Sequence, residues 1–160
     1  MVSKSNESTL RRAALDYLAR REYSFYELKQ KLYSKFPTFE VELIHDVVGA
    51  LRAENLQSDE RFVESYSRYR KSRGFGYKHI RHSLCQKKIE NHKIDQYLVV
   101  DDPEWVEIAV KVVKKKSSER KYHNIGIFER SKITRFMEAR GFMPRQIQKA
   151  IDLSNKVDLD

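Results

Sequence analysis

Apolar residues recur in pairs four positions apart, and the same arrangement appears three times along the chain. Each copy has an apolar pair, a basic residue three positions later and then a large apolar residue. Residues four apart lie on one face of an α-helix, so each pair predicts a helix with a buried stripe. The copies are 52 and 53 residues apart, and their pairs are Leu28 and Leu32, Ile80 and Leu84, and Ile133 and Met137.

Two further amphipathic stretches accompany each copy. The stretches that follow the pairs contain Ile44, Val47, Val48 and Leu51, then Ile94 and Leu98, then Ile147 and Ile151. The stretches that precede them contain Leu15, Leu18 and Ala19, then Phe62, Val63, Tyr66 and Tyr69, then Trp105, Ile108, Ala109 and Val112. Each unit is therefore predicted to hold three helices. The fold class that this pattern predicts is all-α, with three tandem three-helix repeats forming an extended array whose curvature depends on the angles between repeats.

Helix start and stop signals place the repeats at residues 1–57, 58–100 and 101–160. Ser24 followed by Glu27 has the spacing of a capping box, and Asn55 is typical of a helix stop. Asp102 before Pro103 predicts the start of the third repeat. The stretch 117–126 is polar and longer than its counterparts, which predicts an inserted loop after the first helix of that repeat.

Composition agrees with a helical protein of a reducing compartment. Only five Gly and three Pro leave little material for β-hairpins, and no run alternates as a strand does. The single cysteine, Cys85, has no partner for an internal disulfide. No apolar run approaches the roughly 18 residues that a membrane helix needs. We therefore expect a cytoplasmic monomer without membrane attachment.

Positive charge is concentrated in the middle repeat. The three repeats carry net charges of +1, +5 and +3, and the stretch 65–89 contains no acidic residue. Such a surface attracts phosphates or an acidic protein groove. Gly74 and Gly76 interrupt the helical pattern inside this stretch, so several cations flank a tight turn.

The aromatic residues of this stretch have two interpretations. Tyr66 and Tyr69, like Tyr17, fall at helical spacing among aliphatic residues, which favours the core or its rim over stacking with bases. Phe75 and Tyr77 stand beside the glycines and are harder to assign to the core, which makes them candidates for contact with a partner.

Catalytic chemistry is hard to find in this sequence. His79, His82 and Cys85 are three residues apart, but on a helix they spread around the surface instead of converging on a metal. No phosphate-binding loop, dinucleotide fingerprint or paired-carboxylate arrangement is present. The sequence indicates a binding protein, and we expect no enzymatic activity, no metal and no cofactor.

Three of these segments together resemble the RecX family, the bacterial regulators of the RecA recombinase. The segment 58–63, the stretch 73–76 and the residues from Ile80 to Ile89 are similar to the family's signature. The segments 21–32 and 132–147 resemble its first and third repeats, and the whole resemblance covers roughly residues 11–152. One departure is visible: the family usually has glycine at the position of Lys88, which predicts a turn of different conformation here.

The resemblance implies a binding function. Proteins of this family bind RecA filaments on single-stranded DNA, lie in the filament groove and suppress ATP hydrolysis, strand exchange and filament growth. The residues that we expect to face the filament or its DNA in the middle repeat are Arg68, Arg70, Lys71, Arg73, Phe75, Tyr77, Lys78, Arg81, Lys87 and Lys88. The candidates of the third repeat are Arg130, Lys132 and Arg135. Reversal of Arg70, Lys71 and Arg73 is expected to remove inhibition without affecting the fold.

Two other functions remain open at this point. A helical module that binds nucleic acid without a recombinase partner would carry the same charge, and its binding would weaken steeply with salt. An inert helical scaffold, whose charge serves solubility, would bind neither DNA nor filament.

Overall fold

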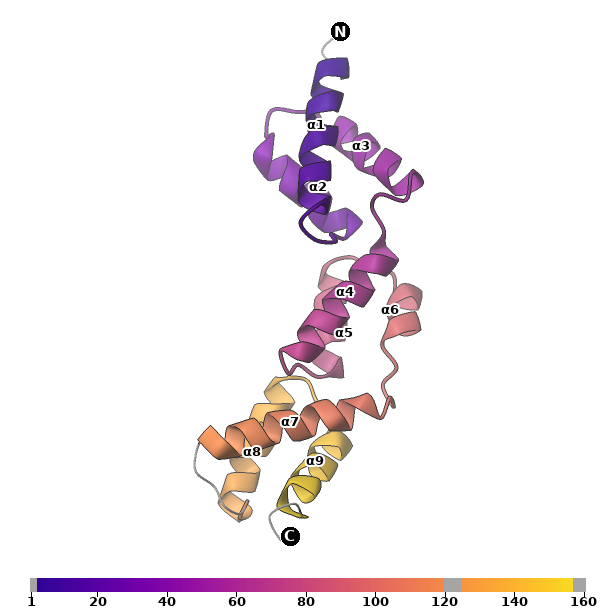
Figure 1. Cartoon of the computed structure of the whole chain (residues 1–160). Coiled ribbons are helices and arrows are strands. Elements are labelled where there is room, and N and C mark those ends of the chain that lie inside the picture. The colour runs from indigo at the N-terminus through magenta and orange to yellow at the C-terminus, as the bar shows by residue number, and fades with distance from the viewer. Residues whose placement is uncertain (1–2, 120–124, 157–160) are drawn as a thin grey trace. The chain divides into compact units, whose positions relative to one another are not determined.

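The computed structural model describes residues 3–119 and 125–156, and these residues form nine helices and no strand (Figure 1). The helices are α1 (Ser3–Leu18), α2 (Phe25–Lys35), α3 (Val41–Ala53), α4 (Asp59–Ser72), α5 (Tyr77–Gln86), α6 (Asn91–Tyr97), α7 (Glu104–Glu119), α8 (Ile127–Ala139) and α9 (Pro144–Lys156). The all-α class predicted from the apolar pairs is confirmed.

The predicted apolar pairs form the core. Leu28 and Leu32 of α2 are fully buried, as are Ile80 and Leu84 of α5, and Ile133 and Met137 of α8 are 2% and 0% exposed. The stripes on α3, α6 and α9 are buried too. The prediction for α1 was displaced by a turn, because its buried face is formed by Leu10, Ala13 and Ala14, whereas Leu15 and Leu18 are half-buried and Ala19 is exposed.

Local signals mark most helix ends. The Ser24 hydroxyl accepts a hydrogen bond of 3.0 Å from the backbone N–H of Glu27, which caps α2 as predicted. Asn55 has a φ of 58° just after α3, which confirms it as a helix stop. Gly74 and Gly76 separate α4 from α5, and the Asp102 carboxylate accepts from the N–H of Glu104 at the start of α7.

The loop predicted at 117–126 begins later than expected. Helix α7 continues through Glu119, because the hydroxyls of Ser117 and Ser118 donate to the carbonyls of Val113 and Lys115 and so find partners within the helix. Residues 120–124 of the predicted loop lie outside the described residues.

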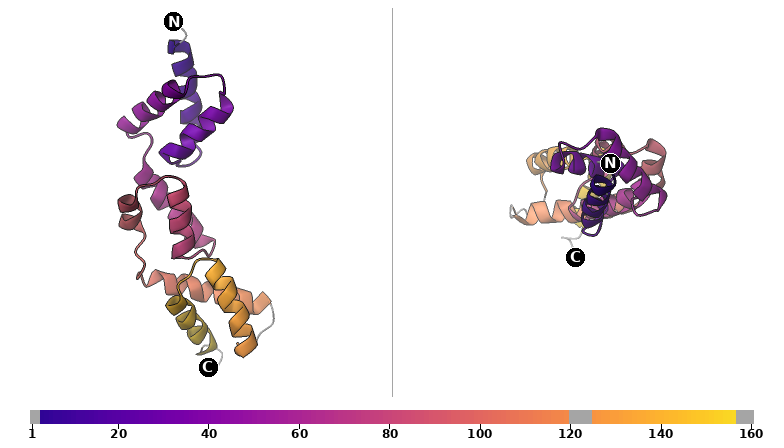
Figure 2. Two further views of the ribbon diagram at one scale, coloured as in Figure 1. Left: turned by 180° about the vertical axis from the view of Figure 1, so that it is seen from behind. Right: turned by 90° about the horizontal axis from the view of Figure 1, so that it is seen from above.

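The contacts divide the chain into two compact units. Unit 1 consists of Met1–Tyr66 with Leu84–Ile94, and unit 2 consists of Ser67–Ser83 with Asp95–Asp160, so α4, α5 and α6 contribute to both. Helices α1, α2 and α3 pack together in unit 1, and α7, α8 and α9 pack together in unit 2 (Figure 2). The repeat boundaries at 57/58 and 100/101 stay a prediction.

Unit 2 contains a contact between two turns that we call the glycine junction (Gly76 with Arg140 and Gly141). The N–H of Gly76 donates to the carbonyl of Arg140 at 2.7 Å, and the N–H of Lys78 donates to the carbonyl of Gly141 at 2.9 Å. A Cβ on Gly76 would lie 2.5 Å from the backbone of Gly141, and one on Gly141 would lie 2.3 Å from the N of His79. Only glycine at both positions lets the two backbones approach this closely.

Unit 1 contains the corresponding contact, the serine junction (Ser24 with Lys87). Ser24 precedes Gly76 by 52 residues and Lys87 precedes Arg140 by 53, the offsets of the sequence repeat. The buried Ser24 hydroxyl donates to the carbonyl of Lys87 at 3.4 Å, and the Lys87 ammonium forms an ion pair with Glu27. Lys88, at the position of Gly141, takes a φ of 59°, so the prediction of a different turn was wrong. The Lys88 side chain is exposed to solvent, so this turn does not require a residue without a Cβ.

A buried carboxylate completes the serine junction. Asp59, the first residue of α4 and 6% exposed, accepts from the N–H of Phe25 at 2.8 Å and from Arg52 at 2.9 Å. Gln57 donates both to Asp59 and to the carbonyl of Tyr23. A buried charge needs such partners, and Asp59 therefore holds the start of α2 against the start of α4.

Candidate partner-binding surface

The turn between α4 and α5 places the predicted cations in two environments. Some have guanidinium or ammonium groups that are held by other side chains of the protein, and others extend into solvent. The difference matters because a cation that is already paired must lose that partner before it binds another.

Arg70 and Lys71 belong to the first group. The Nη2 atom of Arg70 is 2.6 Å from the Nε2 atom of His79, and the guanidinium lies 3.9 Å from the centroid of the Phe75 ring. Lys71, whose side chain is 16% exposed, forms an ion pair of 2.6 Å with Glu104 and lies over the Trp105 ring. Through these contacts both side chains stabilise the α4–α5 turn. We therefore expect reversal of Arg70 and Lys71 to weaken the α4–α5 turn as well, and the effect of the triple reversal stays a prediction.

Three other predicted cations are also engaged within the protein. Arg81 forms an ion pair of 2.5 Å with Asp95, and Arg130 forms one of 2.8 Å with Asp152. Lys87 pairs with Glu27 in the serine junction and lies 5.5 Å from the Tyr66 ring centroid.

The second group is exposed. Arg73 and Lys78 flank the α4–α5 turn, and among the described residues no carboxylate pairs with either side chain. Lys88, Lys132 and Arg135 are exposed in the same way. Arg68 is also exposed on α4, but it interacts with other groups of the protein and does not belong to this group. The five residues of this group come from both units, so only those within one unit are placed relative to one another.

The aromatic candidates are half-buried. The Phe75 ring stacks on the His79 imidazole with centroids 4.4 Å apart, and Tyr77 meets Trp105 edge to face at 6.0 Å. Tyr66 is half-buried beside Phe62, whereas Tyr69 is 58% exposed and not part of the core.

His79 has an electrostatic environment that disfavours its charged form. Burial lowers the pKa of the His79 imidazole, and the nearby positive charges of Arg70, His82 and Arg140 lower it further. The neutral ring can then stack on Phe75 and lie against the Arg70 guanidinium. Within the described part of the chain, no group of three His, Cys, Asp or Glu residues could hold a metal ion.

Arg140 was not among the candidate residues predicted from the sequence. Its Nη1 atom donates to the carbonyls of Arg73 at 2.8 Å and Gly74 at 3.2 Å, the end of α4. Its guanidinium also lies within 4.9 Å of the Phe75 and Phe136 ring centroids. A signal was present, because Arg140 is the basic residue of the third motif copy.

None of the described helices is long and apolar enough to cross a membrane.

Comparison with known proteins gives consistent matches. Residues 58–98 match the model of the RecX second three-helix domain. Regulatory protein RecX of Mannheimia succiniciproducens is 37% identical over 130 residues, covering 81% of this chain and 83% of the relative. Regulatory protein RecX of Pseudomonas putida is 36% identical over 133 residues, with 83% of both chains covered.

Solved structures agree on the fold. The crystal structure of RecX from Lactobacillus salivarius aligns with a TM-score of 0.78 at 24% identity, covering 95% of this chain and 98% of the other. A second crystal structure, of regulatory protein RecX, aligns with a TM-score of 0.76 at 21% identity and covers 94% of this chain and 74% of the other. The resemblance inferred from the three motifs is confirmed, and the chain belongs to the RecX family of regulatory proteins.

Proposed function

We propose that this protein inhibits the RecA recombinase by binding RecA filaments assembled on single-stranded DNA. Binding in the filament groove would suppress ATP hydrolysis, strand exchange and filament growth, and so modulate recombination and DNA repair. The observation that carries the proposal is membership of the RecX family together with the acid-free basic stretch 65–89. No catalytic step by the protein itself is required.

The contact surface that we propose uses the exposed cations. Arg73 and Lys78 stand on either side of the α4–α5 turn and have no carboxylate partner among the described residues. Their charges attract phosphates or acidic side chains without first breaking an internal ion pair. Lys88, Lys132 and Arg135 would add further weak contacts, whose effects combine through effective concentration.

The test is ATP hydrolysis by RecA on single-stranded DNA, measured while the protein is titrated into preformed filaments. We expect hydrolysis to fall at concentrations well below those that coat the DNA. The variant Arg73→Glu with Lys78→Glu is expected to need about thirtyfold more protein for the same inhibition, since two lost contacts of about 1 kcal/mol each weaken binding by about 2 kcal/mol. Lys114→Glu with Lys149→Glu is the matched control, because both lysines are exposed in unit 2 and belong to α7 and α9, not to this turn.

The competing function is a nucleic-acid binder without a protein partner. It predicts inhibition only when the protein saturates bare DNA, and it predicts that binding weakens steeply as ionic strength rises. Inhibition that follows DNA coating would replace the proposed function with this one. Full inhibition by the Arg73 and Lys78 variant would remove the α4–α5 turn from the mechanism.

A further inference from the structure

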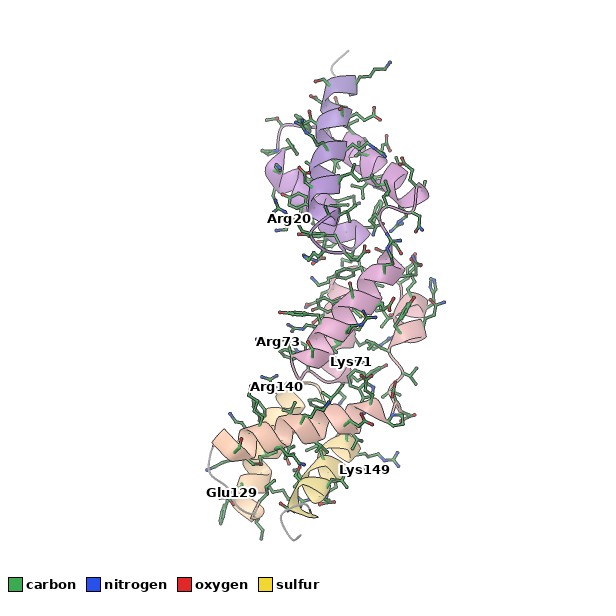
Figure 3. All side chains as sticks on the ribbon, in the orientation of Figure 1. Arg20, Lys71, Arg73, Glu129, Arg140 and Lys149 are labelled. Atoms are coloured by element: carbon green, nitrogen blue, oxygen red, sulfur yellow. The ribbon has the colours of Figure 1, made fainter. Side chains whose placement is uncertain are left out.

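Unit 2 contains a cavity of about 590 Å³ between the C-terminal end of α4, helix α7 and the end of α8. Figure 3 labels Lys71, Arg73 and Arg140, which all line it. Its volume is within the range of small-molecule sites, roughly 300–1,000 Å³. The cavity is therefore large enough for a ligand with several functional groups.

The lining of this cavity is strongly cationic. Seven of its thirteen lining residues are Lys or Arg, and Glu104 is the single acidic one. They come from α4, α7 and the residues that follow α4 and α8, with Lys111 and Lys115 one turn apart on α7 and Arg73 just after α4. Charges that converge on one volume from several sides create a strong local positive potential.

Three of these cations have no carboxylate partner among the described residues. Glu104 is already bound by Lys71 at 2.6 Å, and Arg140 is used by the carbonyls of Arg73 and Gly74. Among the described residues, no carboxylate pairs with Lys111, Lys115 or the Arg73 guanidinium, and all three side chains are exposed. An anion in the cavity would relieve their mutual repulsion.

The geometry favours an anion with several charges close together. Three unpaired cations around one volume exceed what a single carboxylate can neutralise, and lysine is a common phosphate ligand. The cavity wall also contains Phe136, but the Lys116 ammonium and the Arg140 guanidinium lie within 4.9 Å of its ring centroid. A ring occupied by two cations is a poor platform for stacked bases, which argues against a DNA strand.

We propose that this cavity binds a small polyphosphate, either free or carried by a nucleoside. The three cations without internal partners would contact the phosphate oxygens. Ile108 and Val112, which also line the cavity, would face the nucleoside where one is present.

The test is calorimetric titration of the full chain, without RecA or DNA, using tripolyphosphate, ATP and AMP as probes. We expect one saturable site that binds ATP and tripolyphosphate about tenfold or more tightly than AMP, because AMP offers one phosphate to the three cations. Tighter binding of ATP than of tripolyphosphate would assign the ligand to the nucleoside-linked form. Equal binding would assign it to the polyphosphate chain itself.

Matched variants separate this cavity from general positive charge. Lys111→Glu with Lys115→Glu should weaken tripolyphosphate binding about tenfold or more, whereas Lys114→Glu with Lys149→Glu, which changes the net charge equally, should leave it within about twofold. Circular dichroism checks that both proteins fold. If the charge reversal does not fold, protection of Lys111 and Lys115 from acetylation by tripolyphosphate gives the same information in the unmodified chain, with Lys114 as reference.

Two results would overturn the proposal. Equal weakening by both double variants, or equal acetylation of all three lysines, would show diffuse attraction to a basic surface. A thymidine oligonucleotide that binds more tightly than tripolyphosphate, and loses affinity only in the Lys111 and Lys115 variant, would assign the cavity to a nucleic-acid strand. Because RecA is absent from the assay, neither result bears on the proposed inhibition of the filament.

Discussion

At the scale of single residues, His79 is the side chain with the most informative surroundings. From the sequence, His79 was weighed only as a metal ligand. In the structure its ring stacks on Phe75, and its Nε2 atom lies 2.6 Å from the Nη2 atom of Arg70. Burial and the positive charges of Arg70, His82 and Arg140 lower its pKa. Protonation of His79 therefore opposes the folded arrangement of the turn.

This environment predicts a pH dependence of stability. An unfolded histidine has a pKa near 6.5 and takes up its proton first as pH falls, so stability is lost from about pH 6.5 down through the lower pKa of the folded state. Urea unfolding at about pH 7.5 and about pH 5.5 measures this loss. We expect the loss to be smaller in His79→Gln, which stays neutral.

His92→Gln is the control for this experiment, because His92 is exposed and belongs to unit 1, whereas the turn belongs to unit 2. We expect its stability to change with pH as that of the unmodified protein does. An identical pH dependence in His79→Gln and the unmodified protein would contradict the assignment.

The candidate residues show what a sequence can and cannot reveal at this scale. The acid-free stretch identified a basic surface, and Arg73 and Lys78 are exposed on it. It did not reveal that Arg70 and Lys71 bind His79 and Glu104, since Glu104 is 33 residues from Lys71. Whether a cation is paired depends on contacts between distant segments, and composition carries no information about them.

At the scale of helices, the agreement between pattern and structure is closer. Caps and stops depend on residues a few positions apart, so Ser24, Asn55 and Asp102 could be recognised directly. Ser117 and Ser118 were misread as loop residues because serine also bonds back to a helix carbonyl. The displaced stripe on α1 has a different origin, because most positions between Leu10 and Ala19 are apolar and their spacing does not single out one helix face.

Ser24 has a larger role than a cap, and this predicts the effect of removing its hydroxyl. Ser24→Ala is expected to lower the free energy of unfolding by about 1–2 kcal/mol, because the Glu27 N–H and the Lys87 carbonyl both lose a buried partner. Urea denaturation measures the change. Ser131→Ala on the exposed face of α8 is the control and should be neutral, so equal stability of the two variants would contradict this role.

At the scale of the whole molecule, the sequence period predicted repeated units but not how neighbouring turns meet. The backbone hydrogen bonds of the glycine junction join residues 64 and 63 positions apart, and no periodicity identifies such a contact. Gly76 was interpreted as part of a tight turn, and Gly141 only as a member of the third motif copy. Their shared role is the close approach of two backbones, because a Cβ added at Gly141 would lie only 2.3 Å from the His79 nitrogen.

The glycine junction predicts a local loss of stability. Gly141→Ala adds a Cβ at a φ of 88° against the His79 backbone, and we expect it to cost about 1–3 kcal/mol. Hydrogen exchange should show faster amide exchange in α7, α8 and α9, with α1, α2 and α3 unchanged, because the core of α1–α3 is built from other residues.

The matched control is Gly49→Ala in α3, where an added Cβ meets no atom within 4 Å. Alanine favours the helix by about 0.5–1 kcal/mol there, so the same substitution should stabilise the protein. A Gly141→Ala protein as stable as the unmodified chain would contradict the junction, as would equal loss of protection in α1–α3.

The two junctions also bear on how the repeats could diverge. Ser24 and Lys87 occupy the positions of Gly76 and Arg140, and none of the corresponding residues is identical, yet the turns meet at the same places. The carbonyl acceptor is a backbone atom in both cases, and any residue supplies it. An ancestral duplication could therefore accumulate substitutions over most of its surface, provided that the residue facing each acceptor stayed small.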